Sequence, residues 1–406
     1  MIYPVIIVGG GFSGLVLMNM LIKDGIDFLL LEKNDRVGKK ILATGNGRGN
    51  VSNVDLSVCH YHGGNPNFVE FAIKNYDNGH IAEFFEKFGV PLSEEDGKLY
   101  PLSKQSNSVL DALRLSDVNG RIKTSSEVTD VTFDAKTDVF KVVTGSCSYY
   151  GKNVVLAVGG KASPQFGTDG KSYLLAQKFG HKITPLYPSL VQLTVQKGEV
   201  KGLKGIKEKA KVTAFDGDVY LNSASGDILF TDNGISGNTV FYLSAYLIGK
   251  KNPVVYVDYI PEEDLSKITE CLKARRNSYP DLLAETFLSG IVHSRIARKV
   301  IVNEYGEDYA VKRYKDITDG QIEKLVRALK KQKFVVTGNC GFQYSQVTKG
   351  GVCTDEVKNE TMQSKFNPRL YIIGEVLDVD GDCGGYNLQW AFSSAMCAYR
   401  SIKDSL

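Results

Sequence analysis

The sequence predicts an α/β protein in which a Rossmann-like nucleotide-binding domain is interrupted by an inserted β-barrel-like subdomain and a helical subdomain. Three observations point to this fold class. An apolar run at the N-terminus enters a glycine-rich turn, and two later apolar runs also end in glycine. Between those two runs the pattern changes to short strands and then to helices. An insertion inside one α/β domain explains all three.

Size and composition allow more than one domain. The chain has 406 residues, of which 43% are apolar and 23% charged, so it can bury more than one core. The net charge of +3 is small, and we expect no nucleic-acid partner. No apolar stretch approaches about 18 residues, and the N-terminal run is too short for a signal peptide. We therefore expect a cytoplasmic protein without a membrane span.

The first elements form a β-α-β unit. Residues 5–8 are a short apolar strand, residues 9–14 a glycine turn, residues 15–23 an amphipathic helix and residues 28–31 a second strand. Helices are also expected at residues 67–88 and 108–115, and strands at 128–133, 139–144 and 148–158. The last strand is an unbroken apolar run, which is typical of a strand covered on both faces.

The pattern changes near residue 189. Residues 189–259 contain short alternating strands, residues 261–329 are helical, and strands return at 333–337, 343–347 and 371–373. We therefore assign residues 1–188 and 347–406 to the nucleotide-binding domain, residues 189–260 and 333–346 to the barrel-like subdomain, and residues 261–332 to the helical subdomain.

The turn at residues 9–14 satisfies the GxGxxG pattern between a strand and a helix. In such a motif Gly9 permits a tight turn, Gly11 lets the backbone approach a pyrophosphate, and Gly14 lets the helix pack closely on the strand. The free N–H groups of the helix then face the phosphates. Glu32, at the end of the next strand, is suited to accept hydrogen bonds from ribose hydroxyls. The predicted cofactor-binding residues here are Gly9, Gly11, Phe12, Ser13, Gly14 and Glu32.

Two further glycine-terminated strands favour FAD over NAD. One ends in Ala157-Val158-Gly159-Gly160, and the other ends at Gly374 and is followed by Glu375. A long flavin needs protein at its far end, and a chain that returns to its first domain can supply it. The interrupted domain is therefore expected to bind FAD, with Ala157, Gly159 and Gly160 among the contacts.

Three longer motifs resemble a known family. Residues 39–53, KKILATGNGRGNVSN, and residues 361–390, TMQSKFNPRLYIIGEVLDVDGDCGGYNLQW, look like two signatures of the HI0933-like flavoproteins, and residues 159–181 resemble a third. That family includes aminoacetone oxidases and bile-acid reductases. The resemblance runs nearly end to end, and it implies an FAD domain interrupted by a barrel-like and a helical subdomain.

The resemblance also implies roles for individual residues. Glu32 and Lys33 would serve the ribose, and Val128 would hold the adenine through its backbone. The loop along the pyrophosphate would include Lys40, Asn46, Gly47, Arg48 and Asn50. Gly374, Glu375 and Asp378 would hold the ribityl chain and phosphates, and a helix start formed by Gly385, Tyr386, Asn387, Leu388 and Gln389 would lie beside the pyrimidine edge of the flavin. The family usually has Cys where this chain has Gly49, so no mechanism that needs that thiol is expected.

Other reactive residue types have ordinary explanations. Seven scattered cysteines form no CxxC pair, so we expect reduced, mostly buried thiols and neither disulfides nor a zinc site. Cys383 is expected to be a small buried residue without a chemical role. His60 and His62 lack a nearby acidic or third ligand in the sequence, so a solvated loop is expected and no metal site.

Basic residues outside the motifs are expected on solvated surface. This applies to the lysine-rich run at residues 197–211 and to Arg295, Arg298 and Lys299. Phosphate contact is the alternative for the lysine-rich run. Lys161 and Ser163 follow the second glycine strand directly, and a cofactor or substrate role stays open for them.

These features predict an FAD-dependent oxidoreductase that moves hydride between an organic substrate and flavin N5, in a cleft between the FAD domain and the insert. An NAD(P)H-linked reductase of an enone or ketone is favoured. The alternatives are an oxygen-using amine oxidase and a flavin-dependent RNA-modifying or non-catalytic partner. The sequence identifies no catalytic acid or base. Because no second GxGxxG lies between a strand and a helix, NAD(P)H is expected to bind transiently in the substrate cleft.

Overall fold

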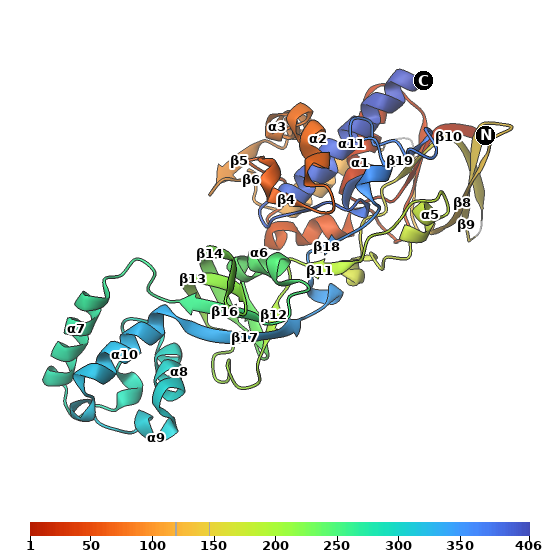
Figure 1. Cartoon of the computed structure of the whole chain (residues 1–406). Helices are drawn as coiled ribbons and strands as arrows, with labels where there is room; N and C mark the ends of the chain where they lie inside the picture. The colour runs from red at the N-terminus through yellow and green to blue at the C-terminus, as the bar shows by residue number, and fades with distance from the viewer. Residues whose placement is uncertain (118–119, 146) are drawn as a thin grey trace. The chain divides into compact units, whose positions relative to one another are not determined.

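The computed structural model describes residues 1–117, 120–145 and 147–406. It contains two compact units, one formed by Met1–Ser189 with Phe342–Leu406 and the other by Leu190–Gly341 (Figure 1). Each unit has its own hydrophobic core.

The first unit is built on a seven-stranded sheet. Its strands follow the order β7–β2–β1–β10–β9–β8, with β19 paired to β10. Their bounds are β1 Ile2–Val8, β2 Phe28–Leu31, β7 Ile122–Lys123, β8 Val128–Asp134, β9 Val139–Thr144, β10 Ser148–Leu156 and β19 Leu370–Ile372. The carboxyl halves of β1 and β10 and the whole of β2 and β19 are buried. Such continuous burial explains their unbroken apolar sequences.

Strand β10 joins two kinds of pairing. Residues 148–151 pair antiparallel with β9, while residues 154–156 pair in parallel with β19. Both halves pair in parallel with β1. As a result, the parallel strands β2, β1, β10 and β19 present their carboxyl ends at one edge of the sheet, and a glycine or acidic residue follows each strand within three positions.

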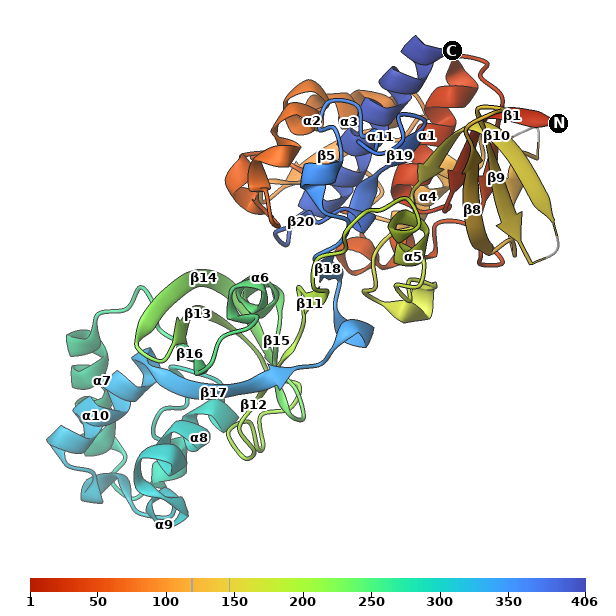
Figure 2. The same ribbon diagram turned by 45° about the vertical axis from the view of Figure 1, so that its right-hand side comes forward.

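Two helices cover this sheet side by side (Figure 2). They are α1, Phe12–Lys23, and α11, Tyr386–Ser405. Residues 12–21 of α1 are all buried, so the expectation of an amphipathic helix is wrong. The reason is that α1 packs on β1 and β2 and is also covered by α11, which comes from the far end of the sequence.

The single helix expected at residues 67–88 is also wrong. The segment contains a 3₁₀ turn at Pro66–Val69, then α2, Glu70–Asn75, and α3, Asn78–Glu86. The side chain of Asp77 accepts hydrogen bonds from the backbone N–H groups of Gly79 and His80, which starts a new helix. The next helix, α4, is Ser106–Arg114.

Short pairs of strands complete the first unit. A three-stranded sheet has the order β3–β6–β5, and two-stranded pairs are formed by β4 with β20 and by β11 with β18. Their bounds are β3 Ser52–Asn53, β4 Tyr61–His62, β5 Leu92–Glu95, β6 Lys98–Pro101, β11 Tyr187–Ser189, β18 Val347–Lys349 and β20 Asp380–Gly381, and a short helix, α5, is Tyr173–Gln177. Strand β10 ends two residues earlier than expected.

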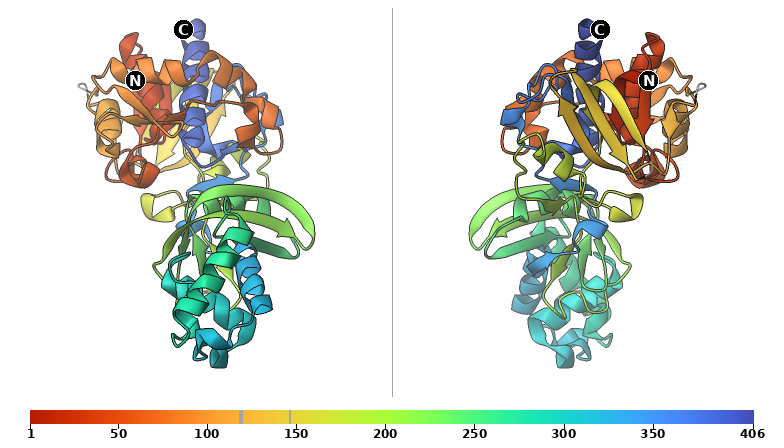
Figure 3. Two further views of the ribbon diagram at one scale, coloured as in Figure 1. Left: turned by 90° about the vertical axis from the view of Figure 1, so that its left-hand side faces the viewer. Right: turned by 90° about the vertical axis from the view of Figure 1, so that its right-hand side faces the viewer.

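The second unit contains a closed barrel of six strands in the order β12–β15–β14–β13–β16–β17. In Figure 3 the chain of this unit runs from yellow-green to blue. The strands are β12 Leu193–Val195, β13 Lys207–Asp216, β14 Val219–Phe230, β15 Gly234–Ser236, β16 Pro253–Asp258 and β17 Gln332–Asn339. Ala210, Val212 and Ala214 alternate into the core of this unit, as expected for a barrel strand. The segment 238–247, expected as strand, is helix α6, Asn238–Leu247. Its apolar residues fit either structure by pattern alone.

Four helices follow β16 and precede β17. They are α7 Leu265–Ser278, α8 Ser294–Tyr305, α9 Glu307–Ala310 and α10 Asp319–Lys330. The expected helix at 282–287 is only a 3₁₀ turn at Ala284–Thr286. Of the expected strand at 343–347, residues 343–344 belong to a 3₁₀ turn at Phe342–Tyr344, and only Val347 is strand, as the first residue of β18. Residues 342–346 cluster with the first unit, because the Ser163 N–H donates to the Phe342 carbonyl and the Ser163 hydroxyl donates to the Ser345 carbonyl.

The structure combines a Rossmann-like domain, a closed barrel and helices, which confirms the predicted fold class. Within the described residues, no helix is long and apolar enough to cross a membrane.

Candidate functional site

The three glycines of the first turn have different surroundings. Gly9 has φ +108°, and a Cβ there would lie 2.3 Å from the Ala157 carbonyl oxygen. A Cβ at Gly14 would lie 2.1 Å from the Gly9 carbonyl oxygen. At Gly11, by contrast, a Cβ would meet nothing within 4 Å. Gly9 and Gly14 therefore permit close packing of the backbone, whereas Gly11 borders open space.

The open space at Gly11 adjoins the N-terminus of α1. Gly11 is the N-cap of this helix, no side chain caps it, and its first turn contains no acidic residue. Free N–H groups and the positive end of the helix dipole are suited to a phosphate group. The geometry fits the pyrophosphate of a dinucleotide, and Phe12 and Ser13 supply the first N–H groups of the helix.

Glu32 ends the next strand and contacts the glycine turn directly. Its Oε2 accepts a hydrogen bond of 2.8 Å from the Gly10 N–H, and its Oε1 accepts bonds from the backbone and side-chain N–H groups of Asn34. A carboxylate oxygen has more than one acceptor site, so both oxygens can also accept ribose hydroxyls. The neighbouring residue Lys33 forms an ion pair of 3.1 Å with Asp169.

The ends of the second and third glycine strands meet at a partly buried polar contact. The Lys40 ammonium lies 2.7 Å from the Glu375 carboxylate. Glu375 also accepts the Thr348 N–H, and a Cβ on Gly160 would lie 2.8 Å from Glu375 Oε1. The Thr348 hydroxyl accepts the N–H groups of Lys161 and Ala162. Thr348 was not predicted, because its partners lie far away in the sequence.

Gly374 links the third strand to both long helices. It has φ +76°, and a Cβ there would lie 2.7 Å from the Ser13 hydroxyl oxygen of α1. The Gly374 N–H donates to Ser394 and its carbonyl accepts the Trp390 indole N–H, both on α11. Ala157 is the residue against which Gly9 packs. The structure thus brings the ends of all three glycine strands together.

The loop at Lys39–Gly47 is a kinked 3₁₀ segment. Asn46 and Gly47 both have positive φ, at +56° and +85°. The Arg48 guanidinium contacts Glu95 at 2.8 Å and lies over the Tyr100 ring. The Asn50 amide donates to the carbonyls of Ser52 and Leu99. Arg48 and Asn50 thus hold this loop against the β3–β6–β5 sheet.

The backbone conformation at residue 49 explains why this chain has Gly49 where the family pattern has Cys. Its φ is +75°, a conformation that favours glycine, and a Cβ would approach Ser106 Cα to 3.0 Å. The family Cys would be strained in this backbone conformation.

Helix α11 begins at a glycine turn. Its N-cap Gly385 has φ +99°, and no side chain caps the helix. The Asn387 side chain pairs with the backbone of Gly381, and the buried Gln389 amide donates to the Tyr76 carbonyl and to Ser393. These two side chains therefore hold the turn in place. The turn can offer a ligand the N–H groups at the start of the helix.

Two further predicted residues lie near the edges of this region. Asp378 accepts the Gly64 N–H at 3.1 Å, and burial raises the pKa of its carboxyl. Val128 is the first residue of β8, opposite Thr144 of β9.

The expectation of a solvated loop at His60 and His62 without acidic neighbours is wrong. Both imidazoles hydrogen-bond to Asp382, at 3.0 Å and 2.7 Å, and Asp382 is buried. The other ring nitrogen of His60 bonds to Asp55 at 3.0 Å. Asp382 is more than 300 positions away in the sequence, so no local pattern could identify it. Among the described residues, no cluster of three or more His, Cys, Asp or Glu side chains is arranged to hold a metal ion.

Lys161 and Ser163 both contact the segment at residues 342–345. The Lys161 ammonium lies 4.6 Å from the centroid of the Phe342 ring, and Ser163 holds the backbone of residues 342–345.

All seven cysteines are free thiols, but only Cys397 is fully buried, and Cys59, Cys147 and Cys271 are exposed, which corrects the expectation of mostly buried thiols. Burial raises the pKa of the Cys383 thiol, as expected for an unreactive residue.

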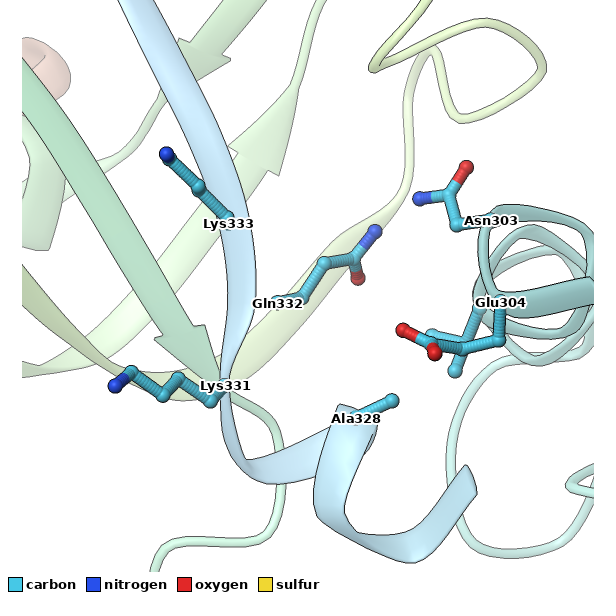
Figure 4. Close-up of a pocket in the computed structure, with 7 residues that line it drawn as sticks. Asn303, Glu304, Ala328, Lys331, Gln332 and Lys333 are labelled. Atoms are coloured by element: carbon cyan, nitrogen blue, oxygen red, sulfur yellow. The ribbon is translucent and has the colours of Figure 1, made fainter. Parts of the chain in front are cut away.

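A separate pocket of about 210 Å³ lies within the second unit (Figure 4). It is formed by α8, the end of α10 and the start of β17, and the Gln332 side chain points into it between Asn303 and Glu304 (Figure 4). None of its lining residues belongs to the glycine strands, so this pocket is distinct from the predicted cofactor site.

The chain was compared with known proteins. Residues 3–401 match the family model described as the HI0933-like protein Rossmann domain. The chain is 34% identical over 405 residues to a 3-dehydro-bile acid delta(4,6)-reductase of Clostridium scindens, and 98% of both chains is covered. It is 29% identical over 404 residues to a ribosomal RNA dihydrouridine synthase of Haemophilus influenzae, again with 98% of each chain covered.

A solved structure with the same fold is the 3-ketosteroid-delta4-(5alpha)-dehydrogenase of Rhodococcus jostii. The TM-score is 0.50 at 13% identity, with 98% of this chain and 96% of that chain covered. The family match and the reductase relative confirm the expected class of an FAD-dependent oxidoreductase. Since the family model covers nearly the whole length, this chain belongs to the HI0933-like family of Rossmann flavoproteins.

Proposed function

We propose that this chain uses FAD to reduce a carbon–carbon double bond that is conjugated to a carbonyl group. The observation that carries the proposal is its end-to-end similarity to the bile-acid delta(4,6)-reductase. The name of the dihydrouridine synthase describes saturation of a pyrimidine ring, in which the double bond is also conjugated to a carbonyl. The two relatives therefore share one type of reaction on different substrates.

The residues described above fit bound FAD. The start of α1 and Gly11 would hold the pyrophosphate, and Glu32 would hold the ribose. Lys40 and Glu375 would contact FAD between the second and third glycine strands. The start of α11 would lie beside the pyrimidine edge of the flavin, where a positive helix end stabilises the negative charge of the reduced ring. Hydride transfer itself is the chemistry that FAD supplies.

NAD(P)H is the proposed electron donor. No second GxGxxG between a strand and a helix is present in the sequence, so NAD(P)H would bind transiently where the substrate later binds. Kinetics with both substrates would then give parallel double-reciprocal lines, as in other ping-pong cycles. Intersecting lines would contradict a shared binding place.

RNA is the second candidate substrate, favoured by the dihydrouridine synthase relatives. The charges of the lysine-rich run at residues 197–211 argue against it, because Lys204 and Lys207 are paired with Asp232 and Asp227 at 2.7 Å and 2.8 Å. Phosphate binding would have to break these ion pairs. A small unsaturated ketone is therefore the favoured substrate.

An anaerobic experiment separates these functions. The FAD-loaded protein is mixed with NADH or NADPH, and the bleached flavin is then offered 4-androstene-3,17-dione, a 3-oxo-4,6-diene bile acid or uracil-containing ribosomal RNA. We expect an unsaturated ketone to restore the oxidised flavin spectrum and to be saturated in equal amount. Bleaching by aminoacetone, with reoxidation by oxygen alone, would instead support an amine oxidase.

A further inference from the structure

Four titratable side chains lie on or directly beside the β4–β20 strand pair. Asp380 is the direct partner of His62 in the antiparallel register, and the Asp382 N–H donates to the His60 carbonyl at 2.9 Å. Directly opposite residues of an antiparallel pair point to the same face, and both imidazoles bond to the Asp382 carboxylate, so the side chains of residues 60, 62, 380 and 382 lie together. We call these four residues the imidazole–carboxylate ladder.

Hydrogen bonds connect Asp55 to three side chains of the ladder. His60 Nε2 bonds to Asp55 and His60 Nδ1 to one oxygen of Asp382. His62 Nε2 bonds to the other oxygen of Asp382 at 2.7 Å. Asp380 follows, directly opposite His62. Two imidazoles bridged by a carboxylate can exchange protons, since each ring can give up a proton at one nitrogen and accept one at the other.

Burial increases along this path. The Asp55 side chain is 63% exposed, whereas Asp382 and Asp380 are 4% and 1% exposed. Asp380 Oδ2 accepts the Ser189 hydroxyl at 3.3 Å, while Oδ1 has no hydrogen-bond partner among the described residues. Lys349 and Asp378 are the other charged groups that act on Asp380. The path thus leads from solvent to His62, which lies opposite a buried acid with spare hydrogen-bonding capacity.

The electrostatics keep protons available near neutral pH. Burial raises the pKa of the Asp380 carboxyl to about 6. Burial also lowers the pKa of His60, but hydrogen bonds to Asp55 and Asp382 outweigh this, and the net shift of its pKa is upward. Groups with such pKa values can both hold and release a proton at physiological pH.

The ladder adjoins the start of α11. The His60 ring is stacked on the Tyr386 ring with centroids 4.5 Å apart, and the Gly381 N–H donates to Asn387 Oδ1 at 2.8 Å. Tyr386 and Asn387 are the first two residues of α11. The ladder is therefore attached to the helix end that would lie beside the flavin ring.

We propose that the imidazole–carboxylate ladder is the proton-delivery site of this oxidoreductase, with His62 as the residue that protonates the substrate. This proposal rests on the proposed reduction of a conjugated double bond. One alkene carbon would receive a hydride, with its electron pair, from FAD that NAD(P)H has reduced. The π electrons then form a bond to the proton of His62 at the other carbon, and the N–H electron pair stays on the ring. His62 recovers a proton from solvent through Asp382, His60 and Asp55.

The test compares His62→Asn with a matched control, His80→Asn. His80 forms a 2.7 Å contact with Asp77 on α3, outside the ladder. The FAD-loaded proteins are reduced with dithionite and mixed anaerobically with 4-androstene-3,17-dione or the 3-oxo-4,6-diene bile acid. We expect His62→Asn to slow flavin reoxidation by about 10²–10⁴-fold, the range for loss of a general acid. The FAD affinity of both variants should match that of the wild type, and so should the rate of flavin reoxidation in His80→Asn. Wild-type reoxidation in His62→Asn would overturn the proposal.

A second measurement does not depend on turnover. The ring nitrogens of ¹⁵N-labelled histidines are titrated by NMR in the FAD-loaded wild type, in Asp382→Asn and in His80→Asn. Because the hydrogen bond to Asp382 raises the pKa of His60, we expect the pKa of His60 to fall in Asp382→Asn and to stay unchanged in His80→Asn. An unchanged pKa of His60 in Asp382→Asn would overturn the ladder. If the wild type reduces no unsaturated carbonyl, the proposed function fails, and this titration alone then decides whether the ladder shares protons.

Discussion

Single residues in the first turn have separate physical roles. Gly9 and Gly14 are required by the protein's own packing, since a Cβ at either would lie within 2.3 Å of a carbonyl oxygen. Gly11 is not required by this packing, because its φ of −78° suits any residue and a Cβ there would meet no protein atom within 4 Å. The packing of the chain and the binding of a cofactor can therefore be tested by different substitutions in one motif.

We predict that Gly11→Ala folds normally but binds FAD at least tenfold more weakly, because the methyl group would occupy the space proposed for the pyrophosphate. Gly14→Ala should destabilise the fold by about 1–3 kcal/mol, since the clash outweighs the gain of about 1 kcal/mol in helix propensity. Urea unfolding without FAD and fluorescence titration with FAD measure the two effects. Unchanged FAD affinity in Gly11→Ala would place the pyrophosphate elsewhere.

A buried acid gives the second residue-scale prediction. The folded-state pKa of Asp380, about 6, lies above the unfolded value of about 3.9. The folded state therefore binds more protons between these values, and the free energy of unfolding falls as pH rises through this window. Above it, the penalty for the buried charge is fully present.

Asp380→Asn removes this penalty while keeping the side-chain volume. We predict a gain in the free energy of unfolding of up to about 3 kcal/mol at pH 8 and little change at pH 4. Urea unfolding of the variant and the wild type at both pH values measures it. An equal effect at pH 4 and pH 8 would show that the charge of Asp380 is not the cause.

At the scale of elements, helix ends decide where the chain departs from its hydrophobic pattern. The apolar residues of the segment 67–88 predict one helix, yet Asp77 caps a new helix inside it. In the second unit, Thr318 and Gln321 form a reciprocal capping box at the start of α10. Such caps satisfy backbone N–H groups that the helix itself leaves free.

We predict that Thr318→Ala destabilises the second unit by about 1 kcal/mol, the usual cost of losing an N-cap hydroxyl. Thr318→Ser keeps the hydroxyl and should restore most of this stability. Thermal unfolding monitored by circular dichroism compares the three proteins. Equal stability of Thr318→Ala and the wild type would mean that water replaces the cap at no cost.

At the scale of the whole molecule, one chain forms two units with separate cores. The first unit is completed only when the chain returns, because β19 pairs with β10 and α11 packs on α1. The two crossings between units start from neighbouring strands, since Ser189 of β11 is the direct partner of Val347 of β18.

We therefore predict that residues 190–341 fold on their own, with cooperative thermal unfolding and dispersed NMR signals. Residues 1–189 joined to 342–406 by a short Gly/Ser linker should retain FAD, because the glycine strands and both long helices lie in that unit. Gel filtration, unfolding and bound-flavin absorbance test both fragments. Loss of FAD from the joined fragment would show that the second unit contributes to cofactor binding.

Local signals in the sequence determined much of this fold. The glycine turn, the strands at residues 28–31 and 139–144 and the buried strand near residue 371 depend on neighbouring residues, and the structure has them at or within one residue of the expected positions. Helix α6 was missed because short apolar runs fit a strand or a helix equally well. The near-complete burial of α1 could not be predicted from the sequence either, because the helix that covers α1 comes from the end of the chain.

The sequence by itself determined an α/β dinucleotide-binding domain with an insertion, because strands, turns and helix starts follow from residues that are adjacent along the chain. Only the tertiary structure decided the polar contacts of the candidate site. His60 and Asp382 are 322 positions apart, and Lys40 and Glu375 are 335 apart. No periodicity spans such a separation, and these side chains meet only because the returning chain adds β19, β20 and α11 to the first domain.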